Sequence, residues 1–167
     1  MVISQEQGEI KAARELTSKS ELKRVRLRRC HADLQGEESG LKEPFGLAQS
    51  HNTTARLIDN ILTVEVAFNF QAFDASDGKI SLFSIQCSFE LDYEIESVYK
   101  PDQEAIAAFK DGNAVFNCWP YARECVQNIT SRMILRPPPL PFLRVIPKPV
   151  KAAPKATESA TTTALKE

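Results

Sequence analysis

The residues best suited to catalysis are few and scattered. The chain has two histidines, His31 and His51, and the residues around them do not suggest a catalytic triad. Phosphate-binding, nucleophile-elbow and zinc-protease motifs are also missing from the sequence. Glu90, Asp92 and Glu94 alternate along a predicted strand, but this pattern does not indicate a catalytic carboxylate pair in a cleft. The sequence therefore gives no support for an enzyme, and we predict no cofactor and no metal.

The cysteines suggest no metal or disulfide framework either. Cys30, Cys87, Cys118 and Cys125 are widely spaced, and no C-x-x-C pair occurs. Cys118 and Cys125 lie two turns apart on one face of a predicted helix, where a free cysteine usually acts as a small apolar residue. Reactive chemistry at these thiols would require a lowered pKa, which the sequence cannot show.

A basic run, residues 23–29, has two interpretations. Arg24, Arg26 and Arg28 share one face of a predicted strand, with Val25 and Leu27 on the other. A nucleic-acid patch would explain them, and would predict salt-sensitive binding that is lost when the arginines become alanine. No aromatic residues are interspersed, and the formal net charge is −1. We therefore favour a solvated strand face that discourages edge pairing, with no nucleic-acid partner.

The overall composition is that of a globular protein. The 167 residues are 43% hydrophobic and 26% charged, which favours one domain with a sizeable core. No secretory signal and no apolar stretch of about 20 residues is visible, so we expect a cytoplasmic protein without membrane insertion.

Strand patterns dominate the first two thirds of the chain. Residues 22–34 form an imperfectly alternating strand, whereas residues 35–60 are weakly patterned and are interpreted as a long loop. Strong alternation over residues 62–70 and 83–95, with a turn around Asp77-Gly78, predicts an antiparallel hairpin.

Helical patterns and composition divide the chain into three regions. Residues 1–20 are predicted as a charged, mostly exposed helical segment, residues 21–146 as the domain, and residues 147–167 as a disordered Lys/Ala/Pro/Thr tail. A short helix is expected from Pro101 to Phe109, with a break at Asp111-Gly112. The main amphipathic helix then runs from about residue 113 to residue 133, and a proline-rich segment follows it.

This main helix carries a family resemblance. Its motif and the Pro/Leu-rich segment after it resemble the SecB family of protein-export chaperones, over roughly a quarter of the chain. The residues that carry the resemblance are Trp119, Pro120, Tyr121, Ala122, Arg123, Glu124, Cys125, Ser131 and Arg132. The resemblance implies an α+β fold, in which a long helix packs on one face of a four-stranded antiparallel sheet. It further implies an ATP-independent holdase that assembles as a homotetramer, a dimer of dimers.

The apolar and aromatic residues around the main helix, taken with the resemblance, suggest candidate site residues; the alternative for each groove residue is that it belongs to an ordinary core. A groove for unfolded client or precursor polypeptides would be lined by aromatic and leucine side chains of the helix and the following segment: Phe116, Trp119, Tyr121, Leu140 and Phe142. Oligomer packing would use one strand face and one helix face: Phe83, Ile85, Cys87, Phe89, Cys125 and Ile129.

Three departures from the family pattern bear on the partner. No amphipathic helix is evident after the proline-rich segment, the tail is basic where classical members end acidic and contact the motor SecA, and the N-terminal segment is long. A divergent chaperone that protects one partner, such as the antitoxin of a toxin–antitoxin system, is therefore favoured over delivery to SecA. A hot-dog-like enzyme and a nucleic-acid-binding protein remain as alternatives.

Overall fold

The computed structural model describes residues 2–5, 7–35, 45–74, 81–133, 140 and 144–147. The elements in chain order are β1 (Val2–Gln5), α1 (Gln7–Ser18), β2 (Ser20–Leu34), β3 (Phe45–Ile58), β4 (Ile61–Asp74), β5 (Ser81–Ile95), α2 (Gln103–Phe109), the π-helical turn η2 (Lys110–Ala114), α3 (Val115–Arg132) and β6 (Arg144–Pro147). The predicted turn around Asp77-Gly78, Phe142 of the predicted groove and residues 148–167 of the predicted tail lie outside the described residues.

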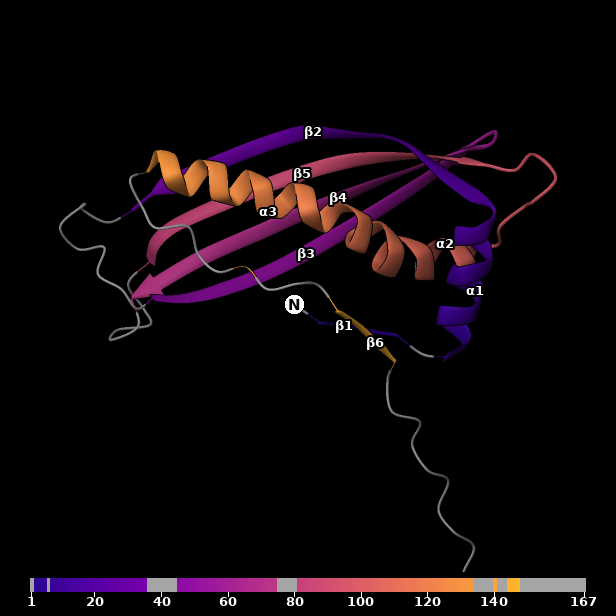
Figure 1. Cartoon of the computed structure of the whole chain (residues 1–167), viewed down its shortest axis with the longest axis horizontal. Helices are drawn as coiled ribbons and strands as arrows, with labels where there is room; N and C mark the ends of the chain where they lie inside the picture. Colours follow the sequence, from indigo (N-terminus) through magenta and orange to yellow (C-terminus); the bar gives the residue numbers. More distant parts are fainter. Residues whose placement is uncertain are drawn as a thin grey trace, which may run out of the picture.

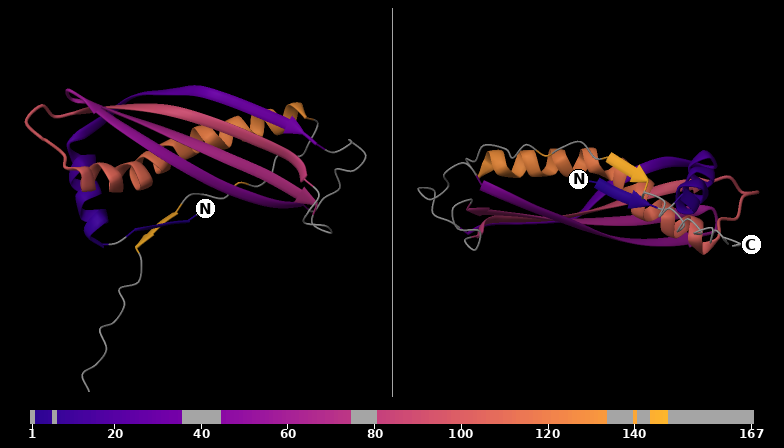
Figure 2. Two further views of the ribbon diagram at one scale, coloured as in Figure 1. Left: turned by 180° about the vertical axis from the view of Figure 1, so that it is seen from behind. Right: turned by 90° about the horizontal axis from the view of Figure 1, so that it is seen from below.

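The main sheet has four antiparallel strands in the order β2-β5-β4-β3. The long helix α3 covers one face of this sheet, and the other face has no helix over it in the described part of the chain (Figures 1 and 2). The expected α+β architecture, a four-stranded antiparallel sheet with a long helix on one face, is confirmed.

The hairpin of β4 and β5 forms the centre of the core. The predicted inward faces of both strands are buried between the sheet and the helices: Leu62, Val64, Val66, Phe68, Phe70, Phe83, Ile85, Cys87, Phe89, Leu91, Tyr93 and Ile95. Tyr93 shows how the helices contact this face. Its ring meets Phe109 edge-on at 4.9 Å, and its hydroxyl accepts a hydrogen bond from Asn117. Burial raises the pKa of Tyr93 to about 12, so the phenol is neutral.

The predicted loop over residues 35–60 is corrected by the structure, because most of it is strand β3. β3 pairs with β4 along its whole length, from Phe45 opposite Asp74 to Ile58 opposite Ile61. A two-residue turn joins the two strands, with Asp59 in the left-handed region at φ 54°. β3 is an edge strand, and the face of β3 that points away from the helices is exposed to water. It therefore needs few apolar residues and lacks the strong alternation of its neighbours.

The predicted helix break at Asp111-Gly112 is also corrected. These residues belong to η2, which joins α2 and α3 into one uninterrupted helical run. A π turn inserts an extra residue without ending a helix. Polar contacts fasten this turn to β3: the Lys110 ammonium donates to Thr53 Oγ1 at 3.0 Å, and the Thr53 hydroxyl donates to Asp111.

The N-terminal helix packs at one end of the molecule. α1 lies beside α2 there (Figure 1), with Ala13 and Leu16 buried and the exposed side chains of Lys11, Arg14 and Glu15 around them. The predicted charged helix is therefore present over Gln7–Ser18, and one row of it joins the core, whereas Val2–Gln5 of the predicted helical segment forms strand β1. β1 and β6 form a separate two-stranded parallel ribbon. Within the described residues, no helix is long and apolar enough to span a membrane.

Candidate functional site

The predicted groove residues do not converge on one groove. Trp119 is buried, with only 3% of its surface exposed, and its ring contacts Phe68 at 5.7 Å and Phe70 at 6.1 Å on β4. Leu140 is also buried in the core. Phe116 and Tyr121 are exposed, but five residues of α-helix place them about 140° apart around the α3 axis. Tyr121 and Phe116 therefore face opposite flanks of α3.

On the flank of Tyr121, an apolar surface runs along the boundary between α3 and β2. Tyr121, Cys125 and Ile129 recur every four residues and form one row of α3. The Tyr121 ring packs on Phe89 at 6.4 Å, and Phe89 is the register partner of Leu27 on β2. One turn further along, the sulfurs of Cys125 and Cys30 are 3.9 Å apart.

We call this surface the apolar strip and define it by six residues: Leu27, Cys30, Leu34, Tyr121, Cys125 and Ile129. Leu27 is 54% exposed, Leu34 is 42% exposed and Tyr121 is 43% exposed, so the strip carries three large apolar side chains with much of their surface open to water. The strip borders an edge strand, because β2 pairs with β5 on one side and with no described strand on the other.

A change of phase in β2 hid one side of the strip from sequence reasoning. A β-bulge between Leu27 and Arg29 shifts the register by one residue. Apolar residues on the helix side therefore fall on odd numbers before the bulge (Val25, Leu27) and on even numbers after it (Cys30, Ala32, Leu34). The imperfect alternation over residues 22–34 was the only signal of this shift, and it did not locate the bulge.

The residues predicted for oligomer packing fall into two groups. Phe83, Ile85, Cys87 and Phe89 are buried between the sheet and the helices of the protomer itself. Cys125 and Ile129 are half-buried on the apolar strip, so part of each side chain is accessible from outside.

The three thiols nearest the strip differ in their acidity. The hydrogen bond with Cys87 has the largest effect on Cys125 and lowers its pKa. Burial opposes this effect, a hydrogen bond with Cys30 adds to it, and the resulting pKa is about 6. Burial and the neighbouring Cys125 raise the pKa of Cys30 to about 11. The hydrogen bond with Cys125 and burial raise the pKa of Cys87 as well. These shifts favour the thiolate form of Cys125 over that of Cys30 or Cys87, and the thiolate is the nucleophilic form of a cysteine.

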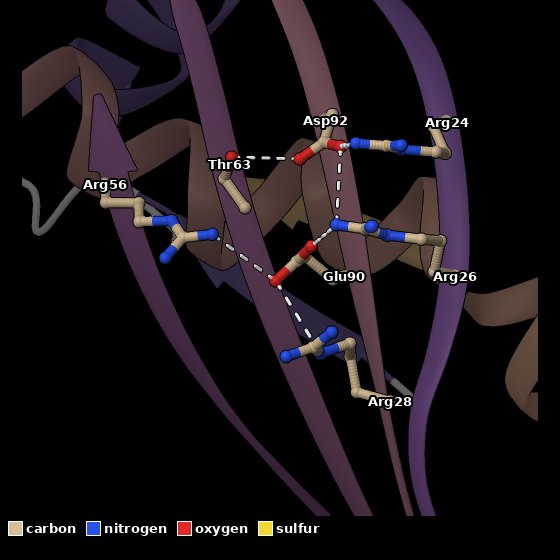
Figure 3. Close-up of polar contacts among 7 residues, drawn as sticks. All are labelled: Arg24, Arg26, Arg28, Arg56, Thr63, Glu90 and Asp92. Carbon is tan, nitrogen blue, oxygen red and sulfur yellow. Dashed lines mark hydrogen bonds and ion pairs between the residues drawn. The ribbon is translucent and has the colours of Figure 1, made fainter. Parts of the chain in front are cut away.

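The opposite face of the sheet carries a network of arginines and buried carboxylates (Figure 3). Asp92 accepts two hydrogen bonds from Arg24, at 2.9 Å and 2.6 Å, and a third from the Thr63 hydroxyl at 2.9 Å. Glu90 pairs with Arg26, and the guanidinium groups of Arg28 and Arg56 lie within 3.8 Å and 3.6 Å of it. The basic row on β2 thus neutralises acidic side chains of β5, as a structural strand face would.

This network predicts an acid-dependent loss of stability. Burial raises the pKa of Asp92, but the hydrogen bonds from Arg24 and Thr63 outweigh it, so the net pKa lies below its ordinary value of 3.8. A lowered pKa in the folded state means that the stabilisation is complete above 3.8 and is lost as the pH falls below it. Urea titrations across that range should show a weaker pH dependence for Asp92→Asn than for the unmodified chain. Parallel stability curves for the two proteins would contradict the assignment.

Within the described residues, no group of three or more histidine, cysteine or acidic side chains has the arrangement of a metal site.

Comparison with known proteins identifies the fold. No family model and no curated protein matches the sequence. Among solved structures, the chain is similar to the Rv1957 SecB-like chaperone of Mycobacterium tuberculosis, in complex with a ChAD peptide from the Rv1956 HigA1 antitoxin. The TM-score is 0.72 and the identity 16%, over 81% of this chain and 99% of that one. A protein of unknown function from Streptococcus agalactiae matches with a TM-score of 0.41 and 11% identity, over 71% of this chain and 93% of that one.

The first of these likenesses confirms the fold expected from the helix motif. The chain has the fold of a SecB-like chaperone, with the same four-stranded antiparallel sheet and long C-terminal helix.

Proposed function

We propose that this chain is an ATP-independent chaperone that holds unfolded polypeptide segments on its apolar strip. The observation that carries the proposal is the strip itself, where exposed Leu27, Leu34 and Tyr121 lie along the boundary of α3 and β2 on a SecB-like fold. Exposed apolar side chains along one surface of a folded protein support a binding function for that surface.

The strip suits an extended peptide in two ways. Apolar side chains of a client would be removed from water against Leu27, Leu34 and Tyr121, which stabilises the complex by about 25 cal/mol for each Å² of apolar surface buried. Among the described strands β2 lies at the edge of the sheet, where backbone N–H and C=O groups could pair with an added strand. Backbone pairing is indifferent to sequence, so the strip would select apolar segments rather than one fixed motif.

We favour a single protein partner, such as an antitoxin, over export precursors. The structural neighbour was solved with a peptide from an antitoxin, which supports a peptide client of this kind. The C-terminal sequence of this chain contains Lys148, Lys151, Lys155 and Lys166, whereas an acidic end is expected for contact with SecA. Delivery to SecA is the alternative, and a binding assay with purified SecA separates the two.

We also propose a homotetramer, on the strength of the family resemblance. Cys125 and Ile129 are the partly accessible members of the predicted packing set, and because they lie on the apolar strip we assign them to the client. Light scattering measures the assembly directly, and a monomeric mass would overturn the tetramer.

A titration against a chemically unfolded client, followed by turbidity, tests the proposed function. Suppression of aggregation near stoichiometric amounts and without ATP is the expected result. A pulldown with the products of neighbouring genes then searches for the natural client. Absence of suppression, together with an empty pulldown, would refute the chaperone function.

A further inference from the structure

Three sulfur atoms meet at the middle of the apolar strip. Cys30 and Cys87 are register partners on the adjacent strands β2 and β5, and both hydrogen-bond to Cys125 of α3. Cys30 is exposed, Cys125 is half-buried and Cys87 is buried. The cluster therefore joins an edge strand to the helix at a point that solutes can reach from outside.

The geometry favours bond formation between Cys30 and Cys125. Their sulfurs are in van der Waals contact at 3.9 Å, and a disulfide requires about 2.05 Å. Cys30 is exposed and stands on an edge strand of the described sheet, so its side chain is less constrained than a thiol in the core. Cys87 is held in the core, with 2% of its surface exposed, and moves less easily.

The chemical roles of the two thiols follow from their surroundings. The hydrogen bonds that Cys87 and Cys30 make with Cys125 lower its pKa and favour its thiolate form. A thiolate attacks peroxides, whereas a protonated thiol does not. Cys30 keeps its proton and lies next to Cys125, which suits it to resolve the oxidised product.

We propose that Cys30 and Cys125 form a reversible disulfide across the apolar strip when hydrogen peroxide is present. The Cys125 thiolate attacks one oxygen of the peroxide and the O–O bond breaks. Hydroxide departs, and Cys125 becomes a sulfenic acid. The Cys30 sulfur then attacks the Cys125 sulfur, the S–O bond breaks, and water leaves with the proton from Cys30. Two thiols lose two electrons and two protons, and the peroxide is reduced to two water molecules.

The disulfide would divide the strip. It would tie β2 to α3 between Leu27 and Tyr121 on one side and Leu34 and Ile129 on the other. An extended peptide that needs both halves would then lose one of them, and the edge of β2 could no longer move relative to the helix. This consequence rests on the proposed function, whereas formation of the bond does not.

Mass spectrometry tests formation of the bond. The full-length reduced protein is treated with hydrogen peroxide, quenched, alkylated and digested, and the expected product is a peptide pair linked through Cys30 and Cys125. Cys30→Ser and Cys125→Ser should not form it, whereas Cys87→Ala should still form it, but more slowly, because Cys125 then loses the hydrogen bond with Cys87. Alkylation of Cys30 after full treatment, a link through Cys87, or a link between two chains would overturn the proposal. If Cys87→Ala fails to fold, mapping of the unmodified chain decides alone.

Client binding tests the consequence. Suppression of aggregation should require at least a tenfold higher concentration of the oxidised protein than of the reduced protein. Dithiothreitol should restore suppression by the oxidised protein. Treatment with peroxide should not change suppression by Cys30→Ser. Equal suppression before and after oxidation would overturn control of the strip. If the reduced protein does not suppress aggregation, the proposed function is wrong. Whether the disulfide forms is still decided by mass spectrometry alone.

Discussion

Replacing Leu27 and Tyr121 together with aspartate should abolish suppression of client aggregation. Both side chains are about half exposed on the apolar strip, and a bound apolar peptide would cover them. The double change removes two apolar contacts of on the order of 1.5 kcal/mol each, which together weaken binding about a hundredfold. It also forces a client to bury two carboxylates, which adds a further penalty. The turbidity assay should then resemble one without chaperone.

Phe116→Asp is the matched comparison for this variant. Phe116 is 52% exposed on the same helix but on its opposite flank, so it resembles Tyr121 in chemistry and exposure. Its replacement should leave suppression within a factor of two of the unmodified chain. An equal loss in Phe116→Asp would move the client site to the other flank.

The mass of each variant separates client binding from assembly. Leu27→Asp with Tyr121→Asp should keep the oligomeric mass of the unmodified chain if the strip holds clients. A reduced mass by light scattering would mean that the strip packs subunits, and would overturn its assignment as the client site.

The hairpin shows what a strong sequence pattern can predict. The alternation along β4 and β5 identified which side chains are buried, because both strands lie in the centre of the sheet and one face of each packs under the helices. The same pattern placed Glu90 and Asp92 on the opposite face, but it did not predict their burial. That burial depends on the length of arginine side chains from β2 and β3, which local periodicity does not report.

The strand β3 shows where a pattern fails. Its central residues, Ser50, His51, Asn52 and Thr53, favour turns or loops by composition. Pairing with β4 along its whole length overrides that preference, and Thr53 gains side-chain contacts with η2. Whether an edge segment forms a strand depends on pairing with its neighbour more than on its own sequence. The sequence pattern alone therefore did not predict β3.

Only part of the candidate site could be predicted from the sequence. The motif of α3 correctly identified the fold, but the predicted groove grouped Tyr121, which lies on the apolar strip, with Trp119, which is buried in the core. The separation of these two residues depends on how α3 is rotated on the sheet, which places Trp119 over β4 and Tyr121 towards β2. The partners from β2 were hidden by the bulge after Leu27, since a shift of one residue exchanges the two faces of a strand.

Trp119→Ala should destabilise the fold more than any change on the apolar strip. The indole is 3% exposed and packs against Phe68 and Phe70, so it joins α3 to the centre of the sheet. Removing a buried tryptophan leaves a cavity and costs about 3–5 kcal/mol. A urea titration at fixed protein concentration should show this loss as a lower midpoint with a nearly unchanged slope.

Phe116→Ala is the control, because it truncates an exposed aromatic ring near Trp119 in the same helix. Its cost should stay within about 0.5 kcal/mol, as for most surface changes. Trp119→Phe should fall between the two, since a smaller ring refills part of the cavity. A cost below about 1 kcal/mol for Trp119→Ala would mean that the indole leaves the core readily. In that case Trp119 would belong to the client site, as predicted from the sequence. The client site would then no longer be limited to the flank of α3 that carries the apolar strip.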